Sequence, residues 1–165
     1  MSFLDSADDP KLAKRRPLLF FLLVTLAVGA SASVLTEPNI ATWYAGLVHP
    51  SFAPPNWLFA PVWTTLYIAM AVAAWRVWRT SGTRSAEMAA YAGQLLFNFA
   101  WSAIFFGGHR IGLAFIEICI LLALILVTTV LFWRRDRLAG LLFLPYLAWT
   151  GFAAFLNYAF WVLNP

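Results

Sequence analysis

The sequence predicts an all-α integral membrane protein that folds as a five-transmembrane-helix bundle. Its composition is the first reason: 62% of the residues are apolar and only 11% are charged, whereas soluble domains carry about 25% charged residues. The second reason is that charged residues gather between five long apolar stretches. Lipid offers the backbone no hydrogen-bond partners, so stretches of this length must cross it as helices. The length of 165 residues predicts one domain.

The N-terminal region contains a polar tail and the first predicted span. Residues 1–16 are polar and end in a basic cluster, and we expect them to form a mostly disordered tail. The first span is expected at about 17–36, an uncharged stretch long enough to cross a bilayer core of roughly 30 Å. A secretory signal peptide cleaved at Ala30-Ser31-Ala32 is the alternative. Gly29 and Ser33 are small residues spaced so that another helix can approach closely.

The stretch from Trp43 to Tyr67 is rich in aromatic residues and prolines, and it contains no Lys, Arg, Asp or Glu. Pro50, Pro54 and Pro55 fix φ and remove backbone donors, so its first half cannot be a regular helix. We therefore expect an aromatic loop over 37–56. A stiff aromatic loop that leads into a helix suggests a lid over a site for a large, flat, apolar ligand.

The other four spans are separated by short turns that contain charged residues. These turns are TSGTRSAE at 80–87, GGHR at 107–110 and RRDR at 134–137. The predicted spans run over about 57–79, 88–106, 111–133 and 138–163. Pro61 lies in the first turn of the second span, where a missing N–H costs little. Pro145 is expected to interrupt the fifth span gently.

Ten of the 11 Lys and Arg residues lie at one end of this bundle: four in the tail, three between Arg76 and Arg84 at the second-to-third connection, and three in the fourth-to-fifth turn. Arg110 alone lies at the other end, with the aromatic loop. The positive-inside rule therefore predicts a cytoplasmic N-terminus and an aromatic loop on the opposite side. This placement explains the formal charge of +4 by membrane topology, and we expect no nucleic-acid partner.

Polar and aromatic residues form one stripe on each of three predicted helices. Helical spacing groups Trp63 with Tyr67, Gln94 with Asn98 and Trp101, and Tyr146 with Trp149, Ala153 and Asn157. Polar groups in a bilayer are costly and usually face the bundle interior. The three stripes therefore predict a shared binding cavity beneath the loop. In the alternative interpretation, the amides only join helices and the aromatic rings only pack.

Few residues suggest chemistry beyond binding. Glu117 is the one carboxylate well inside a predicted span, and it is either a proton relay or ion site or a contact between helices. His49 is a candidate haem ligand, but it lies in a loop and far in sequence from His109. No metal-ligand spacing, nucleophile elbow or phosphate-binding glycine motif is present in the sequence. We therefore expect no metal site and no catalytic residue.

Three segments resemble the signature segments of the translocator protein/tryptophan-rich sensory protein (TspO/MBR) family. They are WYAGLVHPSFAPPNWLFAPVWTTLY, QLLFNFAWSAIFF and LPYLAWTGFAAFLN, and the resemblance covers roughly residues 17–160. It implies a five-helix bundle, commonly a homodimer, that binds porphyrins such as protoporphyrin IX and haem and requires no cofactor. Relatives also bind cholesterol and isoquinoline or benzodiazepine-type drugs beneath the first loop.

The resemblance also implies which residues form the site. Carried over by position, the family's pocket involves Tyr44, Trp63, Asn98, Trp101, Trp149 and Ala153. The stripes add Tyr67 and Tyr146, and we expect Asn98 and Tyr146 to orient the ligand by hydrogen bonds. The resemblance places the dimer contact mainly on the third helix, where Ala86 with Ala90 and Ala89 with Gly93 form small-residue pairs.

We therefore expect a membrane receptor or sensor for tetrapyrroles with a role in the regulation or transport of porphyrins. The alternatives are a light-dependent porphyrin-degrading enzyme and a porphyrin or sterol transporter that uses Glu117. This chain has Ser51-Phe52 where similar bacterial members carry a tryptophan pair, which argues against loop-tryptophan photochemistry. The basic residue that the cholesterol motif needs after Tyr158 is missing, so we expect no high-affinity sterol binding.

Overall fold

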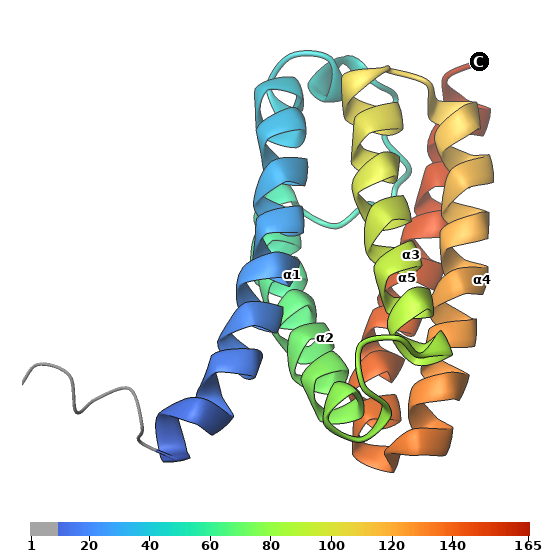
Figure 1. Cartoon of the computed structure of the whole chain (residues 1–165). Coiled ribbons are helices and arrows are strands. Elements are labelled where there is room, and N and C mark those ends of the chain that lie inside the picture. The colour runs from blue at the N-terminus through green and yellow to red at the C-terminus, as the bar shows by residue number, and fades with distance from the viewer. Residues whose placement is uncertain (1–9) are drawn as a thin grey trace, which may run out of the picture.

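Five long helices stand side by side in the computed structural model, which describes residues 10–165 (Figure 1). They are α1 (Pro10–Ile40), α2 (Phe59–Ser81), α3 (Ala86–Ser102), α4 (Ile111–Arg135) and α5 (Arg137–Leu163). Five helical segments are long and apolar enough to cross a membrane, which confirms the predicted all-α membrane fold. Residues 1–9 of the predicted tail lie outside the described residues.

The first helix and the loop have different bounds from those predicted. α1 begins at Pro10 and ends at Ile40, so it is longer at both ends than the predicted 17–36. Pro38 has no backbone N–H to donate, but it does not end the helix. In the last turns the side chains of Asn39 and Thr42 donate to the backbone carbonyls of Leu35 and Pro38, each at 2.9 Å. The loop is correspondingly shorter than 37–56. It contains two short 3₁₀ turns, η1 (Tyr44–Gly46) and η2 (Asn56–Leu58).

The later helices follow the predicted spans with two local features. α3 ends in a π-helical turn, η3 (Ala103–Gly107), which widens the helix next to the loop. α5 continues through Pro145 without ending. The connections between these helices are shorter than the predicted turns: they cover residues 82–85 between α2 and α3, residues 108–110 between η3 and α4, and Asp136 alone between α4 and α5.

The bundle has two chemically different ends. Figure 1 shows the aromatic loop, the α3–α4 connection and the C-terminus at one end, and the α2–α3 and α4–α5 turns at the other. α4 packs along α3 and α5, and α2 packs along α1 and α5. Arg79, Arg84 and Arg134 lie at the second end, so the arginines of these turns gather on the side away from the loop.

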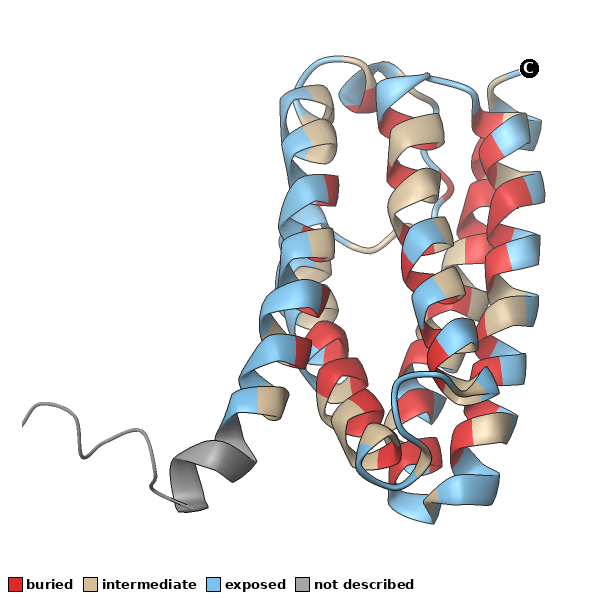
Figure 2. Ribbon diagram, in the orientation of Figure 1, coloured by how far each residue is buried: buried red, intermediate tan, exposed pale blue. Residues whose placement is uncertain are grey.

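Buried residues face the middle of the bundle and large apolar residues cover its outside (Figure 2). Fully buried core residues include Met70, Val77, Phe132 and Phe143. Exposed apolar residues include Leu23, Val34, Ile116, Phe155 and Val162. An apolar surface of this extent would make a soluble protein associate, whereas in a bilayer it is the surface that lipid covers.

Asp136 joins α2 to the start of α5. Its Oδ2 accepts a hydrogen bond from Arg76 Nε at 2.8 Å, and its Oδ1 caps α5 by accepting from the N–H of Leu138 at 2.9 Å. An Asp136→Ala variant should lose about 1–2 kcal/mol of unfolding free energy in a denaturing-detergent titration, since both contacts vanish. Asp136→Asn keeps a capping oxygen and should lose less. Equal losses in the two variants would show that the cap contributes nothing.

Candidate functional site

A cavity of about 520 Å³ lies inside the bundle beneath the aromatic loop. This volume is within the range of small-molecule sites. Nine of its 28 lining residues are aromatic, and they include Tyr44 from the loop, Phe59 and Trp63 from α2, Trp101 from α3, Phe105 from η3 and Trp149 from α5. The predicted shared cavity is therefore present, and rings from several helices offer flat apolar faces to it.

α1 closes one side of the cavity because Gly29 lets it approach α2. Gly29 and Ser33, the predicted small-residue pair, both line the cavity. A Cβ atom on Gly29 would lie only 2.4 Å from the ring of Tyr67, a distance that real Cβ atoms essentially never show. The helices therefore meet at a point where only hydrogen fits.

A chain of hydrogen bonds joins α2, α3 and α5 behind the cavity. The hydroxyl of Tyr67 donates to Asn98 Oδ1 at 2.7 Å. Asn98 Nδ2 donates to the hydroxyl oxygen of Tyr146 at 3.0 Å, and Tyr146 in turn donates to Gln94 Oε1 at 3.0 Å. Because all four side chains are buried, their polar groups satisfy one another where no water is available.

The eight predicted ligand-binding residues divide into two layers. All of them except Tyr146 line the cavity. Tyr146 is fully buried, and it contacts Asn98 from behind. Tyr146 does not line the cavity in this structure, and its hydroxyl is already bonded on both sides, so the expectation that it orients a ligand stays a prediction without support from this geometry. Tyr146 instead positions the Asn98 amide.

Asn157 fixes the ring of Trp101 on the cavity wall. Its Oδ1 accepts a hydrogen bond from Trp101 Nε1 at 2.9 Å, and its Nδ2 donates to the backbone carbonyl of Ile111 at 2.9 Å. Asn157 also lines the cavity. The predicted stripe on α5 included this residue, but the predicted binding set did not. The position of Asn157 on the same stripe as Trp149 was the sequence feature that could have identified it as a cavity residue.

Two buried polar atoms of the cavity-lining residues have no hydrogen-bond partner in the described part of the chain. These buried atoms are the Nε1 of Trp149 and the Oγ1 of Thr150, and both residues line the cavity. Sequence reasoning missed Thr150, although it lies four residues after Tyr146 on the predicted stripe. Since buried polar groups in native proteins are usually paired, these two atoms lack the partners that such groups normally have.

The loop presents one aromatic ring to the cavity. Tyr44 is buried, which raises the pKa of its hydroxyl to about 12 and keeps it neutral at physiological pH. Trp43 instead stacks on His109, with ring centroids 4.3 Å apart and planes 10° apart. Nε2 of His49 lies 3.1 Å from the carbonyl oxygen of Tyr44, and His49 does not line the cavity. His49 is thus a loop contact, and its position does not favour haem ligation.

Asn164 at the end of α5 holds the loop down. Its Oδ1 accepts from the backbone N–H of Val48 at 2.8 Å, and its Nδ2 donates to the carbonyl of Val48 at 3.1 Å. An Asn164→Ala variant should exchange loop amides about tenfold faster, because it loses two hydrogen bonds worth about 0.5–1.5 kcal/mol each. The measurement is hydrogen exchange followed by mass spectrometry.

Asn56→Ala is the matched control, since that side chain makes no hydrogen bond with residues 16–165. If loop exchange is the same in both variants, Asn164 does not restrain the loop.

Glu117 lies in α4 and is only 6% exposed. Neither of its carboxylate oxygens has a hydrogen-bond partner among the described side chains and backbone groups. It does not line the cavity, although Ile118 and Leu121 of the same helix do. Its position therefore gives no support to the transporter alternative.

The small-residue face of α3 is open in the described chain. Ala86 and Ala89 are exposed, and Ala90 and Gly93 are half-buried. A Cβ atom on Gly93 would have no other atom of the described residues within 4 Å. The dimer contact on this face stays a prediction.

Comparison with known proteins agrees with this architecture. Residues 21–162 match the TspO/MBR family. The translocator protein of Sus scrofa is 42% identical over 149 residues, which are 88% of each chain. The tryptophan-rich protein TspO of Archaeoglobus fulgidus is 37% identical over 148 residues, 89% of this chain and 96% of that protein. The tryptophan-rich sensory protein of Cereibacter sphaeroides is 38% identical over 146 residues, 87% of this chain and 90% of that protein. The chain therefore belongs to the TspO/MBR family of membrane proteins.

Proposed function

We propose that the protein is a membrane receptor that binds tetrapyrroles, such as protoporphyrin IX and haem, in the cavity beneath the loop. The observation that carries this proposal is a cavity with nine aromatic lining residues and, on α5, two buried polar atoms without a partner in the described chain. The names of its relatives, translocator protein and tryptophan-rich sensory protein, are consistent with a role in transport or sensing.

The wall chemistry suits a large flat ligand with polar edges. The rings of Trp63 and Trp149 supply stacking surfaces, which contribute about 0.5–1.5 kcal/mol per aromatic pair beyond apolar burial. Asn98 already uses its oxygen and its nitrogen in the buried chain of hydrogen bonds. The indole N–H of Trp149 and the hydroxyl of Thr150 remain to donate to acceptors on the ligand, such as a propionate carboxylate.

The same cavity wall accepts other flat apolar molecules, such as isoquinoline drugs. Independently of the ligand, the chain acts as a homodimer through the small-residue face of α3. By the positive-inside rule, the arginines at the end opposite the loop favour an N-terminus in the cytoplasm. The aromatic loop then lies on the other side of the membrane, and a ligand enters the cavity from that side.

Titration of the purified protein with protoporphyrin IX in the dark, followed by quenching of tryptophan fluorescence, tests this proposal. We expect saturable quenching, and about tenfold weaker binding in a variant with Trp63→Phe and Trp149→Phe, because both stacking surfaces shrink and one donor is lost. Trp57→Phe is the control, since Trp57 is 71% exposed and does not line the cavity. Linear quenching that no variant changes would mean that the porphyrin only partitions into detergent.

A further inference from the structure

Glu37 is the one charged residue among the described residues that line the cavity beneath the aromatic loop. It lies in the last turns of α1, at the loop end of the bundle (Figure 1). Glu37 is also exposed, so it stands at the opening of the cavity and not in its interior. We call the opening at Glu37 the acidic rim.

Glu37 lies on the face of α1 that forms the cavity wall. The residues of this helix that line the cavity include Leu26, Ala30, Ser33, Glu37 and Ile40. They are three or four residues apart, and this spacing places them along one face of a helix. The carboxylate therefore belongs to the cavity wall and not to another face of α1.

Glu37 takes part in no salt bridge in the described part of the chain. The salt bridges found there join Arg76 to Asp136 and Arg135 to Glu87, and both lie at the end of the bundle opposite the loop. The carboxylate of Glu37 thus has no cationic side chain within 4 Å among residues 16–165, and its charge is available to a ligand.

The hydroxyl groups next to Glu37 on α1 donate within their own helix. The Oγ of Ser33 donates to the carbonyl oxygen of Gly29 at 3.1 Å, and the Oγ1 of Thr36 donates to the carbonyl oxygen of Ala32 at 2.9 Å. Neither hydroxyl hydrogen is therefore left to bond the carboxylate.

The basic residues of the loop end do not neutralise the acidic rim. The described lining residues of the cavity include no Lys, Arg or His. His109 is engaged elsewhere, because its Nε2 lies 2.9 Å from Oδ1 of Asn39 and its ring stacks on Trp43. Arg110 forms no salt bridge with Glu37 within the described chain. The rim thus carries one negative charge without a counter-charge from these residues.

Aromatic rings line the cavity at the same end. α1 packs against η1 and η3, which contain Tyr44 and Phe105. Both of these rings line the cavity. The face of an aromatic ring attracts a cation that lies within about 6 Å of the ring centroid. A carboxylate beside such rings therefore suits a cationic group and repels an anionic one.

We propose that the cavity also binds flat aromatic ligands that carry a protonated nitrogen, with their rings against Trp63 and Trp149 and the cationic N–H at Glu37. A hydrogen bond between a cationic donor and a carboxylate is stronger than one between neutral groups. This inference names a further ligand class for the same cavity, and it rests on the proposed function in that the cavity must bind flat ligands. For a porphyrin, the like charge of Glu37 turns the propionates away from the rim.

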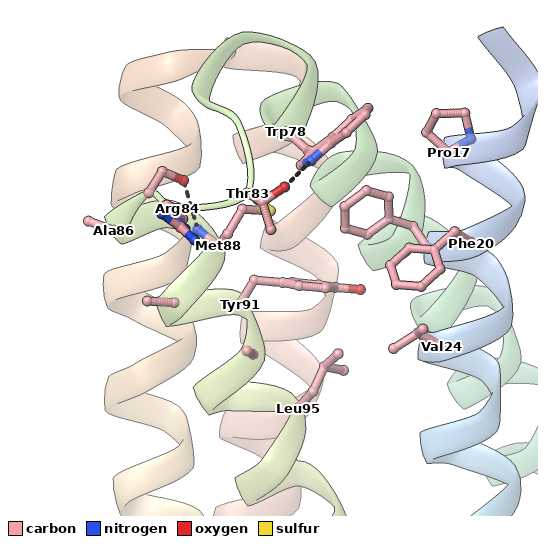
Figure 3. Close-up of a pocket in the computed structure, with 14 residues that line it drawn as sticks. Pro17, Phe20, Val24, Trp78, Thr83, Arg84, Ala86, Met88, Tyr91 and Leu95 are labelled. Carbon is pink, nitrogen blue, oxygen red and sulfur yellow. Dashed lines mark hydrogen bonds between the residues drawn. The ribbon is translucent and has the colours of Figure 1, made fainter. Parts of the chain in front are cut away.

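The second cavity of the bundle does not suit the same ligand. It has a volume of about 1000 Å³ and lies between α1 and α3, in the half of the bundle away from the loop. Figure 3 shows Arg84 near one end of this cavity, with Tyr91 and Leu95 farther along α3. Arg84 is the one charged side chain among its described lining residues. A cation is repelled there, so the two cavities differ in the sign of the charge that they accept.

The test compares three acridines of the same flat shape at neutral pH: 9-aminoacridine is a cation, acridine is neutral and acridine-9-carboxylate is an anion. Quenching of tryptophan fluorescence in the purified protein measures the affinity of each. We expect Glu37→Gln to weaken binding of 9-aminoacridine about fivefold, the effect of one ion pair at an exposed site. The same variant should leave acridine unchanged and bind the carboxylate more tightly, because a repulsion is removed.

Glu37→Asp is the matched control, since it keeps the charge on a side chain that is one methylene shorter. It should bind 9-aminoacridine nearly as tightly as the wild-type protein does. If Glu37→Gln changes the affinities of all three acridines equally, or changes none of them, the proposal is overturned.

The variant with Trp63→Phe and Trp149→Phe tests where the rings bind. It should weaken the binding of all three acridines, because their stacking surfaces in the cavity shrink. Unchanged binding of 9-aminoacridine in this variant would place the cation on the outside of α1 and would overturn the proposal.

Protoporphyrin IX separates this inference from the proposed function. Saturable protoporphyrin binding together with acridine affinities that do not respond to Glu37→Gln would reject the cationic ligand class alone. Acridine affinities with the expected dependence on charge, without saturable protoporphyrin binding, would reject the tetrapyrrole proposal alone.

Discussion

A Gly29→Ala variant is expected to lose about 1–3 kcal/mol of unfolding free energy and to bind ligand more weakly, because the added methyl group has no space. Its Cβ would lie 2.4 Å from Cε2 and 2.7 Å from Cδ2 of Tyr67. The ring cannot turn away freely, since its hydroxyl donates to Asn98 at 2.7 Å. Either α1 and α2 separate or this hydrogen bond breaks, and both changes alter the cavity wall. Helix propensity alone would predict that Gly29→Ala raises the free energy of unfolding by about 1 kcal/mol. A loss of unfolding free energy would therefore indicate the steric clash with Tyr67.

The measurement is a denaturing-detergent titration together with protoporphyrin binding. Gly151→Ala in α5 is the matched control, because a Cβ at that position meets no described atom within 4 Å. That variant should be neutral or slightly more stable. If the two variants have the same free energy of unfolding and the same affinity for protoporphyrin, α1 and α2 do not approach each other closely at Gly29.

An Asn98→Leu variant is expected to lose about 1–3 kcal/mol of unfolding free energy, since it leaves the buried hydroxyl of Tyr67 without an acceptor. Polar contacts between membrane helices average about 0.6 kcal/mol and reach about 1.7. The upper part of the expected range therefore reflects the unpaired group rather than the lost bond. Tyr146 keeps its bond to Gln94, so the damage is confined to the Tyr67 side of the chain.

A second substitution separates the cost of the unpaired hydroxyl of Tyr67 from the loss of the hydrogen bond itself. Tyr67→Phe removes the unpaired hydroxyl, so Asn98→Leu should cost less in the Tyr67→Phe background than in the wild-type protein. The same denaturing-detergent titration gives all four free energies of the double-mutant cycle. If the two substitutions change the free energy of unfolding additively, Tyr67 and Asn98 do not interact. That result would contradict the chain of hydrogen bonds behind the cavity.

The five-helix membrane fold follows from the sequence because charge is costly in lipid. Lys, Arg, Asp and Glu therefore mark the ends of the spans, and the span between two charged turns must be a helix. Helical periodicity also identified the inward faces of three helices. Trp63, Asn98 and Trp149 were assigned to such faces from spacing alone, and all three line one cavity.

The tertiary structure decided how far from the cavity each of these side chains lies. Tyr146 and Thr150 share one stripe of α5, yet Thr150 lines the cavity and Tyr146 lies behind Asn98. Periodicity specifies the direction of a side chain around its own helix. The distance and tilt between helices depend on contacts between residues far apart in sequence, such as Gly29 with Tyr67, and only the folded bundle contains them.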